Sequence, residues 1–353
     1  MSIRVDYNKL IVFLTEIFEK CGLATELAAI VAENLVMAES RGVRSHGLVQ
    51  VKNYVGKYEK GLYNATPKIQ EIKEAGGTLI IEGDKGPGAV CGKYAMRRTI
   101  ERAKETGIAL TVVRNSTHFG MAEYFAKDAV AENMIGLAFT NVSVPLVAPF
   151  GGYTKQLGTN PICIAVPAGE YESVIFDAAT SEQAFNKVVY ARAERKQIPL
   201  GWAVDGKGQP TTDPNAVIEE GALISFGGYK GYGLAFMVNI LTGLLSGACL
   251  QKEADGTVKE NENGVGFNFV AIDVSHFMDP EDFKKLVDVF IKRVKSSPQT
   301  EEDTPILVPG EPEHAKYLDA LEHGIEIFPG VQSELEEVEQ HLQTTITLES
   351  CKK

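Results

Sequence analysis

The residues of this chain best suited to proton transfer are Ser45 and His46, in the segment Arg41-Gly-Val-Arg-Ser-His-Gly47. An imidazole has an unperturbed pKa of about 6.5, so it can give or take a proton near neutral pH. A simpler interpretation makes Ser45 a helix N-cap and His46 a polar residue of the first turn. The motifs further along the chain favour the catalytic interpretation.

Helical periodicity predicts the elements on either side of this pair. One helix is expected between an Asp6 cap and a stop at Gly22, a second over 25–40 and a third over 48–61. After residue 279 the chain becomes helical again, apart from a polar loop over 296–304. We therefore expect an N-terminal helical domain over 1–75 and a C-terminal helical segment over 280–353 that packs with it.

The middle of the chain, 76–279, has the texture of an α/β domain. Short β-rich runs alternate with helical patterns. Strands are expected over 78–81, 108–113, 135–140, 162–166 and 265–272, with helices near 89–105, 120–132, 180–194 and 230–246. The biased stretch 251–264 is expected to be a solvated surface loop.

The segment Gly83-Asp-Lys-Gly-Pro-Gly88 follows a β-like run and precedes a helix, as a Rossmann fingerprint would. Its spacing does not fit, because the next glycine is Gly92 and no acidic residue closes the strand over 108–113. We interpret the segment as a turn followed by a helix start.

Two later glycine-rich segments are better placed for ligands. In the loop over 149–161, Thr159 and Asn160 offer hydrogen bonds just before a strand. The run Phe226-Gly-Gly-Tyr-Lys-Gly-Tyr-Gly233 leads into an apolar helix, where backbone N–H groups, the helix dipole and Lys230 could neutralise a phosphate. A loop that only needs positive φ angles would have the same composition.

Composition narrows the class of protein. The 353 residues include 35 basic and 47 acidic ones, a net charge of −12, without the basic patch of a nucleic-acid binder. The five cysteines are scattered and odd in number, which argues against disulfides and structural zinc, and no metal site is predicted. No signal peptide or membrane span is apparent, so we expect a cytoplasmic protein that is not bound to a membrane.

Taken in order, the motifs resemble those of the malate/L-lactate dehydrogenase family, which includes ureidoglycolate, sulfolactate and diketogulonate dehydrogenases. The motifs that carry the resemblance are Arg41 to Gly47, Asn115-Ser-Thr-His-Phe-Gly120, Gly158-Thr-Asn-Pro161, Asp177-Ala-Ala-Thr-Ser181, Pro199 to Asp205, Pro210 to Pro214, Phe226 to Leu234 and Leu307 to Glu311. The resemblance implies a non-Rossmann α/β nucleotide-binding domain on a largely antiparallel sheet. It also implies a helical domain formed by both chain ends, and a homodimer with active sites near the subunit interface.

The chemistry that the resemblance implies is hydride transfer between NAD(P)H and the C2 carbonyl of a small 2-oxo acid. His46 would then donate the proton in reduction, and Ser45 would fix its orientation. His118 is the alternative acid–base group, and its place between a strand and a helix also suits a nicotinamide contact or a purely structural role.

The cofactor is expected to be NAD, with NADP not excluded. The resemblance assigns cofactor binding to His118, Phe119, Gly120, Asn141, Asp177, Ala178, Ala179, Tyr229, Lys230, Pro309, Gly310 and Glu311. Asp177 could equally be a helix cap. Lys187 stands where some relatives have a carboxylate, and its role stays open.

The substrate end contains a departure from the family pattern, since Gln50 stands where an arginine usually clamps the substrate carboxylate. Gln50 can donate hydrogen bonds but brings no charge. Arg44 or Lys52 could supply the missing charge, and Gln50 could instead be a solvent-facing residue. Tyr54 matches the family, and Thr159 completes the expected substrate residues.

Three functions remain open at this stage. The leading one is an NAD(P)-dependent 2-hydroxy acid dehydrogenase that reduces oxaloacetate to malate. The second is a reductase of a cyclic 2-imino acid, and the third is a catalytically lapsed dimer that binds nucleotide. The third is motivated by the arginine that Gln50 replaces.

Overall fold

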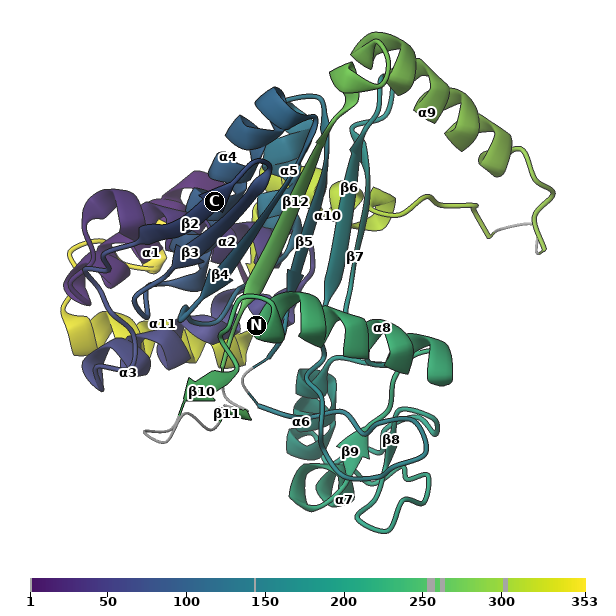
Figure 1. Ribbon diagram of the computed structural model, residues 1–353. Helices are drawn as coiled ribbons and strands as arrows, with labels where there is room; N and C mark the ends of the chain where they lie inside the picture. The colour runs from purple at the N-terminus through teal and green to yellow at the C-terminus, as the bar shows by residue number, and fades with distance from the viewer. Residues whose placement is uncertain (1, 143, 253–257, 261–263, 301–303) are drawn as a thin grey trace.

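The computed structural model describes residues 2–142, 144–252, 258–260, 264–300 and 304–353 (Figure 1). Its centre is a seven-stranded sheet with the order β2-β3-β4-β12-β5-β6-β7. The strands are β2 (Gln70–Ala75), β3 (Thr78–Glu82), β4 (Ile108–Arg114), β5 (Met134–Thr140), β6 (Ile162–Pro167), β7 (Ser173–Ala178) and β12 (Phe267–Asp273). Neighbours are antiparallel except β3 and β4, which confirms the expected largely antiparallel sheet.

Two helices, α4 (Gly88–Thr106) and α5 (Glu123–Ala131), pack against this sheet. Helix α4 connects the parallel pair β3 and β4, because parallel strands need a crossover. The core between helices and sheet is rich in aromatic and small apolar side chains, among them Phe119, Phe125, Phe267 and Phe269. This packed layer is the rigid support for the loops that follow β4 and β5.

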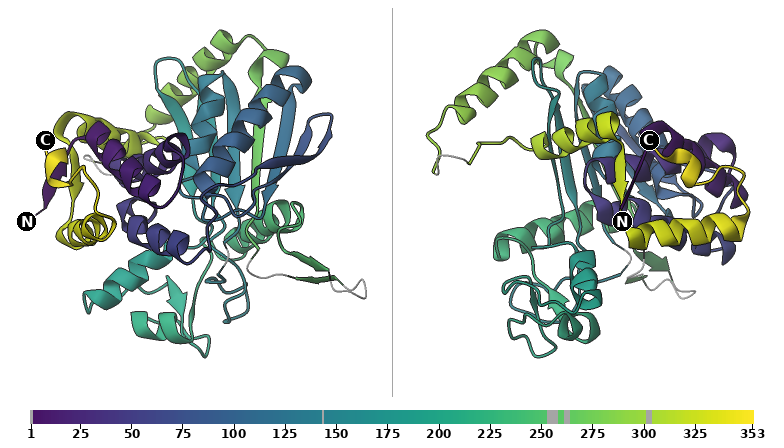
Figure 2. Two further views of the ribbon diagram at one scale, coloured as in Figure 1. Left: turned by 90° about the vertical axis from the view of Figure 1, so that its left-hand side faces the viewer. Right: turned by 180° about the vertical axis from the view of Figure 1, so that it is seen from behind.

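The two chain ends form one helical domain, as expected. It contains α1 (Tyr7–Lys20), α2 (Thr25–Ser40), α3 (Val51–Glu59), α10 (Glu311–His323), α11 (Pro329–Leu342) and the short helix η5 (Glu349–Cys351). Strand β1 (Ile3–Val5) pairs with β13 (Ile325–Ile327), and one apolar core holds residues of both ends. Figure 2 shows the N-terminal and C-terminal helices side by side. Asp6 caps α1 as expected, accepting bonds from the N–H groups of Asn8 and Lys9.

The expected domain limits at residues 75 and 279 assign two elements to the helical domain that lie outside it in the structure. Strand β2 belongs to the sheet, and its six exposed residues carry no apolar alternation that could reveal it. Helix α9 (Pro280–Lys295) projects beside the sheet, away from the helical domain (Figure 1). Its Ile291 packs with Ala168 and Val308 in a small separate core.

A small lobe hangs below the sheet in Figure 1. It contains α6 (Phe185–Ala193), β8 (Ala203–Val204), α7 (Pro214–Glu219) and β9 (Ala222–Leu223), around a core with Val188 and Val217. Helix α8 (Tyr229–Asn239) continues into a π-helical turn, Ile240–Leu244, and joins the lobe to the sheet. The residues before α6 in the helix expected over 180–194 are not helical.

The chain after α8 differs from the surface loop expected over 251–264. Strands β10 (Leu250–Lys252) and β11 (Val258–Glu260) pair as an antiparallel hairpin. The other residues of that stretch up to residue 263, and residues 301–303 of the polar loop expected over 296–304, lie outside the described residues. Within the described chain no helix is long and apolar enough to cross a membrane.

The segment at residues 83–88 is a turn and a helix start, as interpreted from its spacing. Helix α4 begins at Gly88, where a Cβ atom would lie 2.1 Å from the backbone oxygen of His118. The glycine is therefore required by the close approach of the His118 loop.

Candidate active site

The Ser45–His46 pair lies in a double turn between α2 and α3. The 3₁₀ helices η1 (Arg44–His46) and η2 (Leu48–Gln50) form this turn, and the Oγ atom of Ser45 lies 2.8 Å from Nδ1 of His46. Ser45 lies inside η1, whose N-cap is Val43, so it is not the N-cap of the simpler interpretation. Its hydroxyl is committed to the imidazole.

The buried carboxylate of Glu39 fixes this turn through a backbone hydrogen bond. Its Oε2 atom accepts the N–H of Leu48 at 3.0 Å, and a Cβ atom at Gly47 would lie 2.2 Å from the same oxygen. Burial raises the pKa of Glu39 to about 7, although the bond from Leu48 and the nearby Arg44 act in the opposite direction. The glycine after His46 is thus needed for the carboxylate to reach the backbone.

His118 and Tyr54 complete the cluster. The rings of His46 and His118 stack with centroids 5.5 Å apart and planes 17° apart. The hydroxyl of Tyr54 lies 2.5 Å from Nδ1 of His118. The structure thus brings together four residues from three separate segments, and both imidazoles remain partly exposed.

The surroundings keep both imidazoles neutral near pH 7. Burial lowers the pKa of His46 to about 4. Burial, with added repulsion from His46 and Lys57, lowers the pKa of His118 to about 3. Burial raises the pKa of Tyr54 well above its usual value, so its phenol stays protonated and donates to Nδ1 of His118. His118 then carries its proton on Nε2.

The three residues considered for the substrate carboxylate have other partners in the structure. Gln50 donates from Nε2 to the backbone oxygen of Ser45 at 2.8 Å. Lys52 pairs with Glu337 at 2.6 Å. Arg44 lies 3.6 Å from Glu39 and 3.7 Å from Glu326.

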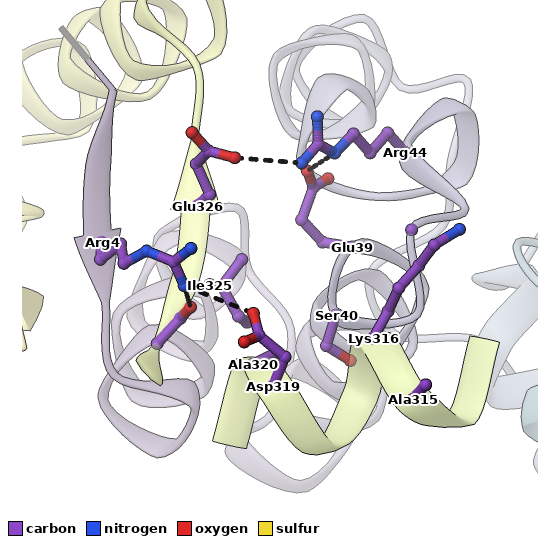
Figure 3. A pocket seen from close by; sticks show the side chains of 12 residues that line it. Arg4, Glu39, Ser40, Arg44, Ala315, Lys316, Asp319, Ala320, Ile325 and Glu326 are labelled. Atoms are coloured by element: carbon purple, nitrogen blue, oxygen red, sulfur yellow. Dashed lines mark hydrogen bonds and ion pairs between the residues drawn. The ribbon is translucent and has the colours of Figure 1, made fainter. Parts of the chain in front are cut away.

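Arg44 points into a cavity of about 360 Å³ between the end of α2, β1, α10 and β13 (Figure 3). Its guanidinium also lies 4.0 Å from the centre of the Phe328 ring. The lining of this cavity includes Arg4, Lys316 and Asp319 but none of the four clustered residues. The cavity is therefore distinct from the Ser45–His46–Tyr54–His118 cluster.

Several of the expected cofactor residues serve the packing of the sheet domain. Phe119 is buried among Phe125, Phe267 and Phe269. At Gly120 φ is +82° and a Cβ atom would lie 2.1 Å from Oδ1 of Asn34. Asn141 is buried and bonds the backbone of Gly264 and Gly266 at 2.6 and 2.8 Å, so its amide fastens that segment to the end of β5.

The expected residues at the end of β7 also have structural partners. Asp177 accepts the N–H of Glu123 at 2.8 Å, so its carboxylate caps the start of α5. Desolvation by the surrounding protein raises its pKa to about 6, although part of the residue reaches solvent. Ala178 and Ala179 follow at the strand end and are half-buried.

The segment Pro309–Glu311 runs along the edge of β7. The backbone oxygen of Pro309 accepts the N–H of Ile175 at 3.0 Å, and Gly310 has φ of +94°. Glu311 begins α10, pairs with Lys295 and accepts the N–H of Val308. Its carboxylate is therefore occupied by the protein itself.

At the start of α8, the residues expected to bind the cofactor have backbone and side-chain groups that the described protein does not use. Gly227 and Gly228 have φ of +57° and +65°, and no side chain caps the helix. Tyr229 and Lys230 are exposed, and Lys230 makes no ion pair within the described part of the chain. Free backbone N–H groups beside a cation fit the diphosphate of a nicotinamide cofactor.

Thr159 lies in the loop over 149–161, whose Phe150 ring lies 6.2 Å from the ring of Tyr229 at the start of α8. Its backbone oxygen accepts bonds from the N–H and hydroxyl of Thr180 at 2.8 and 2.9 Å, and the residue is half-buried.

Among the described residues, no group of three or more histidine, cysteine or carboxylate side chains is placed to hold a metal ion.

Three contacts near the cluster were not expected from the sequence. Asn186 of α6 approaches the backbone oxygen of Ser45 at 3.4 Å, Lys57 donates to the hydroxyl of Tyr63 beside His118, and Arg41 pairs with Glu123 at 2.7 Å. Both members of the last pair are buried, and they join the end of α2 to the start of α5. Arg41 is part of the quoted motif, but nothing in its sequence neighbourhood signals burial.

Comparison with known proteins defines the class. Residues 5–336 match the model of the malate/L-lactate dehydrogenase family. The malate dehydrogenase of Pyrococcus horikoshii is 41% identical over 95% of this chain and 94% of its own, and its solved structure superposes with a TM-score of 0.87 at 38% identity over 98% and 97%. The L-sulfolactate dehydrogenase of Methanocaldococcus jannaschii is 38% identical over 92% and 93%.

A solved Δ1-piperideine-2-carboxylate reductase from Pseudomonas syringae has a TM-score of 0.79 and 27% identity, covering 96% of this chain and 99% of that one. The chain belongs to the malate/L-lactate dehydrogenase family. It is an NAD(P)-dependent 2-hydroxy acid dehydrogenase, so the expected class of enzyme is confirmed.

Proposed function

We propose that this enzyme reduces oxaloacetate to malate with NADH. The observation that carries the proposal is the stacked pair His46 and His118, each with a hydroxyl partner on Nδ1. Its 41% identity with a malate dehydrogenase supports the choice of substrate. Bound NADH supplies the hydride that the substrate carbon receives.

His46 is the proton donor in this proposal. Its Nδ1 is bonded to Ser45, so Nε2 is the atom left to donate to the oxygen that becomes the hydroxyl. His118 is less suited to the role, because the neighbouring His46 and Lys57 oppose its protonation in addition to burial. A substrate carboxylate beside His46 would raise its pKa from about 4 toward the working pH.

Substrate binding is proposed for Tyr54, Thr159 and Arg44, whereas Gln50, the fourth residue expected from the sequence, is bonded to the backbone oxygen of Ser45. Of these, Tyr54 already lies in the cluster. Arg44 would have to leave Glu39 and Glu326, 3.6 and 3.7 Å away, to reach a substrate carboxylate, and the buried carboxyl of Glu39 would then lose its neighbouring cation.

Cofactor binding is proposed at the start of α8, with Lys230 meeting the diphosphate and Tyr229 beside it. The further cofactor residues are proposed to be His118, Phe119, Gly120, Asn141, Asp177, Ala178, Ala179 and Pro309 to Glu311. Those with internal bonds, such as Asn141, would shape the binding surface through their backbone. NAD is proposed over NADP, and parallel assays with both distinguish them.

We further propose a homodimer. Helix α9 projects from the sheet and leaves one apolar face uncovered, formed by Leu286, Val289, Phe290 and Val294. A contiguous apolar face of this kind is typical of a protein interface. The test is the mass in solution by light scattering: a dimer is expected, with monomers for Phe290→Asp, and a monomeric wild type would contradict the proposal.

We propose a reducing, cytoplasmic location, because the five cysteines are scattered along the chain and odd in number. The second candidate function is reduction of a cyclic 2-imino acid, favoured by the likeness to the Δ1-piperideine-2-carboxylate reductase. A lapsed, nucleotide-binding dimer is the third, and the intact Ser45–His46 pair argues against it.

The assay that separates the three follows the absorbance of NADH and NADPH at neutral pH with oxaloacetate, pyruvate and a cyclic 2-imino acid. We expect oxaloacetate and NADH to give the highest kcat/KM. A cyclic imine as the best substrate would replace the leading proposal by the second candidate. Binding of NADH without turnover of any of them would leave the third.

A further inference from the structure

We propose that Gln50 is a positioning residue, which holds the Ser45–His46 turn through the backbone oxygen of Ser45, with Asn186 of the lobe as a second donor to the same atom. The inference rests on the proposed role of His46 as the acid–base group. It gives Gln50 a task other than binding the substrate carboxylate.

The amide of Gln50 is oriented from both ends. Its Nε2 atom donates to the oxygen of Ser45 at 2.8 Å, and its Oε1 atom accepts from Nδ2 of Asn53 at 3.1 Å. Because a backbone oxygen can only accept, the nitrogen of Gln50 must face Ser45, and its oxygen is left to accept from Asn53. Gln50 and Asn53 both lie in the first turns after η1. The bond from Gln50 to the oxygen of Ser45 therefore closes the Ser45–His46 turn.

The oxygen of Ser45 depends on this donor. The neighbouring backbone groups are used differently: the N–H of Gly47 bonds the oxygen of Arg44, and the N–H of Leu48 goes to Glu39. Among the described hydrogen bonds, the oxygen of Ser45 accepts only from the side-chain amides of Gln50 and Asn186. The side chain of Gln50 therefore replaces the backbone bond that a regular helix would have made.

This oxygen is well placed to control His46. It belongs to the peptide unit between Ser45 and His46, and the hydroxyl of the same Ser45 holds Nδ1 of His46 at 2.8 Å. Rotation of that peptide would move the serine hydroxyl and the imidazole together. A hydrogen bond fixing the peptide therefore fixes the atom that transfers the proton.

Asn186 connects the lobe to the same backbone oxygen of Ser45. It lies in the first turns of α6, and its Nδ2 atom approaches the oxygen of Ser45 at 3.4 Å, a longer contact than that of Gln50. The lobe therefore touches the proton-transfer turn at the atom that Gln50 already holds. We expect Asn186 to make the smaller contribution.

The test is Gln50→Met, which keeps the length of the side chain and removes the donor. We expect kcat with oxaloacetate and NADH to fall about tenfold, the effect of losing one hydrogen bond from a positioned group, with KM for oxaloacetate within about twofold. Asn53→Ala should lower kcat about twofold to threefold, and Asn186→Ala by a similar factor. Lys60→Met, on an exposed residue just after α3, is the matched control and should leave kcat unchanged.

A second readout does not depend on turnover. Titration of ¹³C-labelled histidines by NMR, with the His46 signal assigned through His46→Ala, should give a different pKa for His46 in Gln50→Met than in the wild type. A raised KM with unchanged kcat would instead make Gln50 a substrate clamp and overturn the inference, as would unchanged kcat and an unchanged His46 titration. If the wild type turns over no 2-oxo acid, the proposed function fails, and the titration still decides the role of Gln50.

Discussion

The proton-transfer cluster and the start of α8 are two parts of one proposed site, but they are built in opposite ways. In the cluster, Ser45, Tyr54 and Gln50 each have a hydrogen-bond partner inside the chain. At the start of α8 no side chain caps the helix, Tyr229 is 63% exposed, and Lys230 is exposed beside it. Proton transfer needs groups fixed within hydrogen-bond reach, whereas a diphosphate is held by a field of N–H groups and charge that tolerates less exact placement.

The largest expected effect comes from the cluster. His46→Ala should lower kcat by about 100-fold or more, typical of losing a general acid, with little change in the Kd for NADH. Steady-state kinetics and NADH fluorescence titration measure the two quantities. His323→Ala, on an exposed histidine paired with Asp319, is the control. Turnover near the wild-type level in His46→Ala would transfer the acid–base role to His118.

The buried carboxyl beneath the turn should make stability depend on pH. The pKa of Glu39 is raised in the folded protein from 4.5 to about 7, so the folded state binds the proton more tightly than the unfolded state. Relative to Glu39→Gln, the wild type should therefore lose stability as pH rises from about 4.5 to about 7, by on the order of 3 kcal/mol.

Denaturant unfolding of both proteins at pH 5, 6, 7 and 8 measures this difference. It should stop changing above pH 7, where Glu39 is ionised in both states. A constant difference across the range would mean that Glu39 is already ionised at pH 5 in the folded protein.

The phenol that bonds His118 should have a smaller effect. Tyr54→Phe removes the hydroxyl that fixes the tautomer of His118, and we expect kcat/KM to fall about tenfold, the value of one net hydrogen bond. Tyr58→Phe is a matched control, because the buried hydroxyl of Tyr58 has no hydrogen-bond partner among the described residues. Equal losses in both variants would show that aromatic packing, and not the bond to His118, is responsible.

The smallest effect is expected at the open region. Lys230→Ala should raise the Kd for NADH about fivefold and leave kcat nearly unchanged, because one exposed cation contributes about 1 kcal/mol or less. Lys230→Arg should retain most of the affinity, and the difference between the two variants should shrink at high salt. A fall in kcat without a change in Kd would place Lys230 nearer the reacting atoms than the diphosphate.

Much of the architecture could be predicted from periodicity. The helices over 25–40 and 89–105 carry long apolar faces, and they appear as α2 and α4. Strands β2 and β7 were not among the expected strands. Most of their residues are exposed or half-exposed, and they pair through backbone hydrogen bonds that composition does not indicate. The hairpin of β10 and β11 lies in a stretch that was expected to be a loop from its biased composition.

The candidate site was predictable in type but not in arrangement. The segment at 41–47 and the motif at 115–120 marked His46 and His118, yet no spacing rule could place their rings 5.5 Å apart. The same holds for Arg44, which has a carboxylate partner on β13, almost 300 residues along the chain. The histidine pair depends on how the helical domain packs against the sheet, and the pair of Arg44 and Glu326 on how the two chain ends pack together.

The sequence by itself determined which groups can transfer a proton, which segments carry glycines with freedom for positive φ, and which faces must be buried, because these are properties of residue type and short-range order. Only the tertiary structure decided that Gln50 faces the oxygen of Ser45, that Asp177 caps α5 and that Tyr54 reaches His118. A hydrogen bond requires two atoms within about 3 Å in a defined direction, and that distance is set by the packing of elements far apart in the chain.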